Sequence, residues 1–327
     1  MKPKIIVYKK VDPTILDFIK ETCEVIYFEK LESQTYPRFY QELKDTHGIL
    51  GSGLKVDTKL LEQAPQLKIV SNISVGYDNL DIPQLTMRNI MATNTPEVLN
   101  DTVADTVFGL LLATARRMPE LNQYVKAGQW QRQDGEKLYG VDVHHKVLGI
   151  IGMGGIGSAI AKRAHFGFDM PILYHNRSRN VEVEQTYHAT YCSLEELCQQ
   201  SDFICLMTPL TPETKKLIGE REFKLMKKTA IFVNGSRGAT VDEEALVKAL
   251  QNRDILAAGL DVFAQEPVRS DHPLLSLDNA VTLPHIGSAT YETRLKMAKL
   301  AAENLVLGLQ GKIPPTLINR EVKENHS

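Results

Sequence analysis

The segment that most constrains the fold of this chain is a glycine-rich loop, Gly152-Met153-Gly154-Gly155-Ile156-Gly157, which has the spacing G-x-G-x-x-G. It follows an apolar run at residues 147–151 and precedes a helical stretch at 158–165. A strand, a glycine loop and a helix in this order predict a βαβ unit that binds a dinucleotide phosphate at the helix N-terminus. A glycine-rich turn without a ligand is the alternative.

Each glycine of such a loop has its own physical task. The first permits the tight turn, the second lets the backbone approach a pyrophosphate, and the third lets the helix pack close to the strand. The predicted contacts of this loop with a cofactor are therefore made by Gly152, Gly154, Gly155, Ile156 and Gly157.

Short apolar runs alternate with helical stretches along the whole chain. In the first hundred residues the runs lie at 5–8, 25–28, 48–50 and 67–70, and in the second half at 147–151, 171–174, 202–207, 230–233, 257–262 and 280–283. This alternation predicts parallel sheets. The 327 residues suffice for two domains of ~150 residues each. The predicted fold class is α/β, with two Rossmann-like or flavodoxin-like parallel-sheet domains.

Composition narrows the class of protein. Hydrophobic residues make up 43% and charged residues 24%, as in globular chains, and the net charge of −2 gives no bulk attraction for nucleic acid. The longest uncharged stretch, 147–161, is shorter than the ~20 residues of a membrane span. We expect a soluble, cytoplasmic protein with no nucleic-acid or membrane partner and no metal. The 4 cysteines lack C-x-x-C spacing, which favours buried free thiols.

The turn after the second strand of the βαβ unit predicts the cofactor. An NAD-binding domain places a carboxylate ~20 residues after the glycine loop, where it binds the ribose 2′-hydroxyl. Here no Asp or Glu occurs from 170 to 181, and two arginines, Arg177 and Arg179, stand in the turn. A guanidinium binds a 2′-phosphate, whereas a carboxylate repels it. The sequence therefore predicts NADP(H) over NAD(H), with contacts from Asn176, Arg177 and Ser178. A basic, solvent-exposed turn in a domain that binds NAD(H) is the alternative.

Three polar residues follow three other apolar strands. Arg237 follows the run at 230–233, Glu266 the run at 257–262, and His285 the run at 280–283. Ligands of open α/β sheets bind at the carboxyl ends of strands. Each residue alone is more commonly a surface or capping residue, but the three together are candidate catalytic residues.

With these motifs the chain resembles the D-isomer-specific 2-hydroxyacid dehydrogenases over nearly its whole length. The segments that carry the resemblance, besides the glycine loop, are 73–79, 234–238, 260–267 and 284–289. Segments 143–146 and 163–168 are similar to a bacterial group of glyoxylate and hydroxypyruvate reductases, also called 2-ketogluconate reductases. Formate dehydrogenases, phosphoglycerate dehydrogenases and corepressors that use the fold to sense dinucleotides are the alternatives.

The resemblance implies NADPH-dependent reduction of small 2-keto acids (glyoxylate, hydroxypyruvate and 2-ketogluconate) to D-2-hydroxy acids. Arg237 would bind the substrate carboxylate, His285 would protonate the ketone oxygen, and Glu266 would hydrogen-bond the imidazole. The backbone amides of Val75 and Gly76 would also bind the substrate carboxylate. The sequence does not rank the substrates.

The resemblance also implies an architecture and further cofactor contacts. Residues 1–100 and 290–327 would form the substrate-binding domain, with the dinucleotide-binding domain, 101–289, inserted between them. A homodimer through the cofactor domain would use residues 130–139. Asp261 would bind the nicotinamide amide, with a strand-end cap as the alternative. The other implied cofactor contacts are Thr106, Thr208, Pro209, Asn234, Gly235, Ser236 and Gly287.

Overall fold

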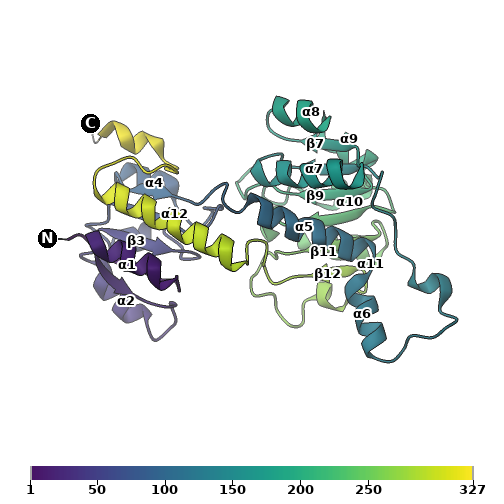
Figure 1. Ribbon diagram of the computed structural model, residues 1–327, viewed down its shortest axis with the longest axis horizontal. Coiled ribbons are helices and arrows are strands. Elements are labelled where there is room, and N and C mark those ends of the chain that lie inside the picture. Colours follow the sequence, from purple (N-terminus) through teal and green to yellow (C-terminus); the bar gives the residue numbers. More distant parts are fainter. Residues whose placement is uncertain (1, 326–327) are drawn as a thin grey trace. The chain divides into compact units, whose positions relative to one another are not determined.

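The structure is a computed structural model that describes residues 2–325, and its chain divides into two compact units (Figure 1). Unit 1 contains the chain up to Leu99 and again from Thr290 onward, and unit 2 contains Asn100–Ala289. Both units are parallel sheets with helices packed on them, so the predicted α/β class with two parallel-sheet domains is confirmed.

Unit 1 is built on a five-stranded parallel sheet in the order β2-β1-β3-β4-β5. A flavodoxin-like sheet has this order. The strands are β1 (Lys4–Val7), β2 (Glu24–Tyr27), β3 (Gly48–Gly51), β4 (Ile69–Asn72) and β5 (Met91–Thr93). The helices are α1 (Pro13–Thr22), α2 (Tyr36–Leu43), α3 (Thr58–Leu61), α4 (Ile82–Met87) and α12 (Tyr291–Leu309), with the 3-10 helix η4 (Arg320–Asn325).

The C-terminal helix α12 completes unit 1. In Figure 1 it runs beside α1, and its inner face packs on the central strands. The Ser71 hydroxyl on β4 donates to the Ala301 carbonyl of α12 at 2.7 Å, and Asn304 of α12 donates to the Asn94 carbonyl after β5 at 3.4 Å. Residues from the two ends of the chain therefore form one core.

Unit 2 is a seven-stranded parallel sheet in the order β12-β11-β10-β9-β6-β7-β8. Read from β8, this is the doubly wound order of dinucleotide-binding domains. The strands are β6 (Leu148–Ile151), β7 (Ile172–His175), β8 (Thr190–Tyr191), β9 (Phe203–Leu206), β10 (Ile231–Asn234), β11 (Ala257–Leu260) and β12 (Ala280–Thr282). The α-helices are α5 (Asn100–Ala115), α6 (Met118–Lys126), α7 (Gly155–Phe168), α8 (Val181–Tyr187), α9 (Leu194–Gln200), α10 (Glu220–Leu225) and α11 (Glu243–Gln251). The 3-10 helices are η1 (Gly135–Leu138), η2 (Gly238–Thr240) and η3 (Pro273–Ser276).

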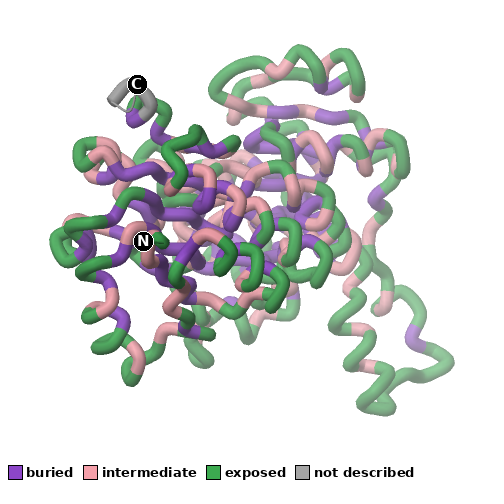
Figure 2. The backbone as a smooth tube through the Cα atoms, turned by 60° about the vertical axis from the view of Figure 1, so that its left-hand side comes forward, coloured by how far each residue is buried: buried purple, intermediate pink, exposed green. Residues whose placement is uncertain are grey.

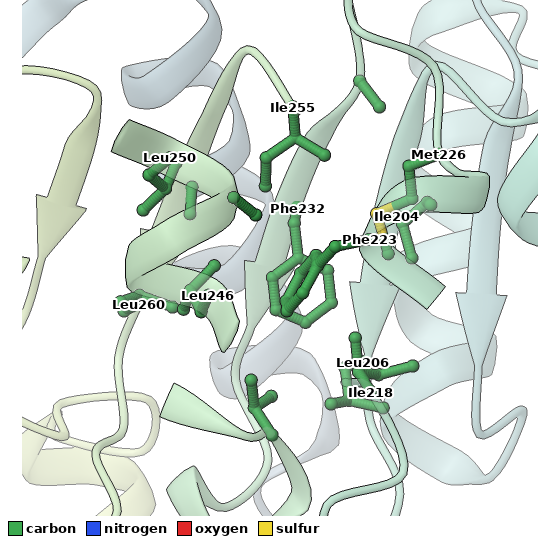
Figure 3. Close-up of a cluster of buried hydrophobic side chains, with 14 of the residues drawn as sticks. Ile204, Leu206, Ile218, Phe223, Met226, Phe232, Leu246, Leu250, Ile255 and Leu260 are labelled. Carbon is green, nitrogen blue, oxygen red and sulfur yellow. The ribbon is translucent and has the colours of Figure 1, made fainter. Parts of the chain in front are cut away.

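An apolar cluster holds one face of the unit 2 sheet against its helices (Figure 3). Phe223 of α10 and Phe232 of β10 meet edge to face with ring centroids 5.5 Å apart, and Leu246 and Leu250 of α11 pack into the same cluster. Edge-to-face pairs add to the stabilisation from buried apolar area. The strands that precede the candidate catalytic residues are therefore packed against this apolar cluster.

One segment of unit 2, from residue 117 to residue 140, is mostly exposed, as Figure 2 shows for α6 and the chain that follows it. It begins at Arg117 and is tied locally by Asp134, which accepts hydrogen bonds from the Tyr124 hydroxyl at 3.1 Å and the Gln131 amide at 2.7 Å. Trp130 is 68% exposed and Tyr139 is 68% exposed. We call this segment the α6 arm.

The composition led to two expectations, one about membrane-spanning helices and one about the cysteines, which the structure can test. Among residues 2–325, no helix combines the length and the apolar character needed to cross a bilayer. Cys23, Cys198 and Cys205 are buried free thiols as expected, and burial raises the pKa of Cys205 to about 12. Cys192 is only half-buried, because it follows the short outermost strand β8, so the expectation of full burial is wrong for this residue.

Candidate active site

The glycine loop joins β6 to α7 and has the geometry that its spacing predicts. Gly152 has φ +100°, and a Cβ there would lie 2.7 Å from the Met207 carbonyl carbon. A Cβ on Gly154 would meet nothing within 4 Å, whereas one on Gly157 would lie 2.3 Å from the Gly152 oxygen. The first glycine therefore makes the turn, the second leaves open space for a ligand, and the third permits close packing.

A second observation at this loop fits a bound dinucleotide. The Thr208 hydroxyl, in the loop after β9, is buried and has no hydrogen-bond partner among the described residues. The backbone nitrogen of Thr208 would lie 2.9 Å from a Cβ on Gly152, so Thr208 lies next to the first glycine of the loop. Buried hydroxyls are normally paired, and an unpaired one marks a place for a ligand or water. The residues present therefore fit a dinucleotide cofactor.

The turn after β7 lies beside the glycine loop. The Asn180 side chain donates to the Met153 carbonyl at 3.3 Å, and the Asn180 amide donates to the Tyr174 hydroxyl at 2.8 Å. These contacts hold the ends of the turn, while Arg177 and Ser178 between them are exposed. The Arg177 side chain is therefore accessible to solvent, and its charge helps to lower the pKa of Glu213.

Arg179 is engaged elsewhere. Its guanidinium pairs with Glu184 of α8, Nε to Oε1 at 3.0 Å and Nη2 to Oε2 at 2.6 Å. Arg179 is therefore already paired with a carboxylate, a contact that the sequence did not predict. Glu184 lies just beyond the window 170–181 that contains no carboxylate, and the first turn of α8 brings it back over the loop.

His285 and Glu266 form a directly bonded pair. The imidazole Nδ1 lies 2.7 Å from Glu266 Oε2, and Glu266 Oε1 accepts from the Phe263 amide at 3.0 Å. Burial alone would raise the pKa of Glu266, but the His285 hydrogen bond, the Phe263 amide and the charge of Arg237 together lower it. With Nδ1 bound to a carboxylate, Nε2 is the nitrogen available for proton transfer.

Arg237 is brought to this pair by a close approach of two loops. A Cβ on Gly238 would lie 1.8 Å from the Phe263 carbonyl carbon, so only glycine lets the turn after β10 touch the loop after β11. Asn234 shapes the turn, since its Oδ1 accepts from the Ser236 amide at 3.0 Å and its Nδ2 donates to the Arg237 carbonyl at 3.1 Å. Arg237 thus lies close enough to the Glu266–His285 pair for its charge to help lower the pKa of Glu266.

Asp261 lies behind His285. Its carboxylate accepts hydrogen bonds from the Ile286 and Gly287 amides, each at 2.8 Å, and burial raises its pKa despite these bonds. The Thr106 hydroxyl donates to the Gly287 carbonyl at 3.2 Å. Both carboxylate oxygens of Asp261 are thus bonded to backbone amides, as in the capping alternative that the sequence left open.

The other sequence-predicted residues lie in two places. The remaining cofactor candidates lie at the carboxyl edge of the unit 2 sheet, and they are Gly155 and Ile156 at the start of α7, Asn176 after β7, Pro209 after β9, and Gly235 and Ser236 after β10. Val75 and Gly76 lie in unit 1 after β4, where their carbonyl oxygens accept from Asn94 at 2.8 Å and Asn72 at 2.9 Å. The loop is thus held through its carbonyls.

Unit 2 combines a parallel doubly wound sheet and a glycine loop with an arginine, a glutamate and a histidine at its strand ends. These features together are typical of a dinucleotide-dependent dehydrogenase. Residues 108–287 match the family described as "D-isomer specific 2-hydroxyacid dehydrogenase, NAD binding domain". The chain belongs to the D-isomer-specific 2-hydroxyacid dehydrogenase family, which confirms the resemblance found in the sequence.

Individual relatives are similar over their full length. The chain is 51% identical over 324 residues to glyoxylate/hydroxypyruvate reductase B of Escherichia coli (strain ATCC 8739), covering 99% of this chain and 100% of the relative. It is 49% identical over 323 residues to glyoxylate/hydroxypyruvate reductase B of Klebsiella pneumoniae subsp. pneumoniae, with the same coverage of 99% and 100%.

Solved structures show the same fold. A protein from Thermus thermophilus matches with a TM-score of 0.88 at 38% identity, covering 96% of this chain and 99% of the other. The NADPH-dependent glyoxylate/hydroxypyruvate reductase of Sinorhizobium meliloti, solved in complex with NADP and malonate, matches with a TM-score of 0.86 at 34% identity, covering 99% and 98%.

Proposed function

We propose that this chain catalyses the NADPH-dependent reduction of small 2-keto acids, glyoxylate and hydroxypyruvate foremost, to D-2-hydroxy acids. The observation that carries the proposal is the hydrogen-bonded pair of Glu266 and His285 with the charge of Arg237 nearby, at the edge of a sheet whose glycine loop fits a dinucleotide. The similarity to glyoxylate/hydroxypyruvate reductases supports the substrate class. 2-Ketogluconate is a further candidate substrate.

Each residue of the site has its own role in the proposed reaction. Bound NADPH supplies the hydride that reduces the keto carbon. His285 donates a proton from Nε2 to the ketone oxygen, and Glu266, bonded to Nδ1, fixes the orientation of the ring. The Arg237 guanidinium binds the substrate carboxylate through parallel hydrogen bonds. His285 then recovers its proton from water.

We infer a division of labour between the units. Residues 101–289 bind the dinucleotide, and residues 1–100 with 290–327 bind the substrate through the Val75 and Gly76 amides. The Asn72 and Asn94 side chains hold this loop by donating to its carbonyl oxygens and not by accepting from its amides. This arrangement supports the assignment of the amides to the substrate. Oxidation of NADPH on addition of glyoxylate or hydroxypyruvate tests the function. Failure of both acids to oxidise NADPH would refute it.

For the cofactor we propose NADP(H), with Arg177 as the residue that binds the 2′-phosphate. Its exposure between the anchored ends of the turn supports this role, as does the NADPH dependence of the Sinorhizobium meliloti relative. A charge-assisted hydrogen bond contributes ~1.5–3 kcal/mol. Arg177→Ala should therefore lower the ratio of kcat/KM for NADPH to that for NADH by about 10-fold or more.

Arg179→Ala is the matched control for this test. Arg179 lies two residues away but is held by Glu184, so its removal should leave the cofactor ratio close to that of the unmodified enzyme. Equal ratios in the Arg177→Ala variant and the unmodified enzyme would contradict the assignment.

We also propose a homodimer formed through the α6 arm. An arm with Trp130 and Tyr139 each 68% exposed presents apolar area that association would bury. Light scattering on the intact chain should give twice the mass of one chain. The double variant Trp130→Ser, Tyr139→Ser should shift this mass toward that of a monomer.

A further inference from the structure

The sheet of unit 1 has its own point of reversal, and a lysine stands there. In the order β2-β1-β3-β4-β5 the chain changes direction of travel between β1 and β3. Open α/β sheets bind ligands outside the carboxyl ends of the strands at such a point. Lys9 follows the end of β1, Ser52 follows the end of β3, and the Lys9 ammonium donates to the Ser52 hydroxyl at 2.5 Å.

A second cation reaches the same place from another element. Arg294 lies in the first turn of α12, and both it and Lys9 are partly buried. Burial and then the charge of Arg294 lower the pKa of Lys9 to about 8, and burial lowers the pKa of Arg294. The two charges are therefore close enough to repel each other.

Among residues 2–322, whose side chains the structure describes, no carboxylate forms an ion pair with either of these cations. The adjacent Lys10 shows the ordinary arrangement, since its ammonium pairs with Glu29 at 2.8 Å on the surface. Two neighbouring cations that are partly buried without a counter-ion are costly, because burial weakens solvation and strengthens repulsion. A bound anion would remove both costs.

We propose that Lys9, Ser52 and Arg294 form a second anion subsite, which binds the distal carboxylate of a dicarboxylic 2-keto acid. This inference rests on the proposed function, in which Val75 and Gly76 after β4 take the first carboxylate. β3 lies between β1 and β4, and adjacent strands are ~4.8 Å apart. Lys9 extends over the end of β3 to reach Ser52, so its ammonium lies one strand away from β4, the strand that precedes Val75 and Gly76.

The kinetic test compares oxaloacetate with glyoxylate, which lacks a second carboxylate, with NADPH as cofactor. The unmodified enzyme should reduce both acids. Lys9→Gln and Arg294→Gln should each raise the KM for oxaloacetate about 10-fold more than the KM for glyoxylate, the scale of one lost charged hydrogen bond. Lys9→Arg, which keeps the charge, should retain most of the preference. Lys10→Gln, at the exposed neighbour, should change neither KM.

A binding measurement tests the anion subsite separately from the proposed reductase function. Succinate has the length of oxaloacetate but cannot be reduced, and butyrate is its partner with one carboxylate. Calorimetric titration of the NADP⁺-bound enzyme should show tighter binding of succinate than butyrate, and Lys9→Gln should abolish the difference. Equal succinate affinity in Lys9→Gln and Lys10→Gln, or no oxaloacetate reduction by an enzyme that reduces glyoxylate, overturns the subsite alone. Failure to reduce any 2-keto acid overturns the proposed function, and the titration still decides the subsite.

Discussion

The carboxylate of Asp261 accepts a hydrogen bond from the Gly287 amide at 2.8 Å, and its other oxygen accepts one from the Ile286 amide at the same distance. His285, the residue before these amides, has φ +54°, a conformation that non-glycine residues seldom adopt. Surrounding structure must hold such a backbone in place. Asp261 therefore positions the segment that carries the imidazole.

Replacement of Asp261 by Asn tests this positioning. An amide side chain has one acceptor oxygen, so one of the two backbone amides would face an NH₂ group instead of an acceptor. We expect the free energy of unfolding to fall by ~1–3 kcal/mol, measured by urea denaturation, together with a lower kcat. Unchanged stability and turnover would show that the two hydrogen bonds do not constrain the segment.

Replacement of His285 by Gln removes the proposed general acid. The side chain can still accept or donate a hydrogen bond, but it cannot transfer a proton at neutral pH. We expect kcat for glyoxylate to fall by ~10²–10⁴-fold, the usual contribution of general acid catalysis. His188→Gln is the control, because His188 is exposed and has a similar φ of +52°. Near-normal turnover in the His285 variant would rule out this role.

Replacement of Gly238 by Ala should separate the two loops of the active site. The new Cβ would lie 1.8 Å from the Phe263 carbonyl carbon, a clash with backbone that no rotamer relieves. We expect a lower melting temperature and a loss of kcat, because Arg237 moves away from Glu266. A variant with normal stability and activity would mean that the close approach is not required.

Replacement of Gly154 by Ala should have a different effect. A Cβ at this position meets nothing within 4 Å, so the protein should fold with unchanged melting temperature. The methyl group would instead occupy the space through which a pyrophosphate approaches the backbone. We expect a raised KM for NADPH with little change in the KM for glyoxylate. An unchanged KM for NADPH would place the cofactor elsewhere.

The inferred subsite predicts a pH dependence of substrate preference. The pKa of Lys9 is about 8, so its ammonium is charged below this pH and neutral above it. Arg294 of α12, the charged group that acts on Lys9, stays charged throughout, and Ser52 after β3 is neutral. The KM for oxaloacetate relative to glyoxylate should rise as the pH passes through about 8. Lys9→Gln should make this ratio independent of pH, and a ratio that still rises would contradict the assignment.

Much of the fold follows from local patterns in the sequence. The run at 147–151 and the glycines after it predict β6, the loop and the start of α7, because each glycine is required by a local constraint on the backbone. Arg237, Glu266 and His285 could be placed at strand ends for the same reason. The nearness of Arg237 to Glu266 depends on the close approach of Gly238 to Phe263, a tertiary contact that the sequence does not show.

The features that the sequence did not reveal depend on residues distant in the chain or on the backbone. Arg179 is captured by Glu184 only because α8 turns back toward the loop. Lys9 and Arg294 are separated by most of the chain, and neither belongs to a motif. The charge of Arg294 acts on Lys9 because α12 packs on the strands of unit 1.

The return of the chain to unit 1 has a consequence for the order in which the molecule is assembled during translation. Unit 2 is one continuous stretch, so it can fold as soon as Ala289 has left the ribosome. The first 99 residues are made earlier but lack α12, which covers β3 and β4 and supplies Arg294. The unit whose synthesis starts first is therefore completed only after unit 2, because its strands need a helix that follows unit 2 in the chain.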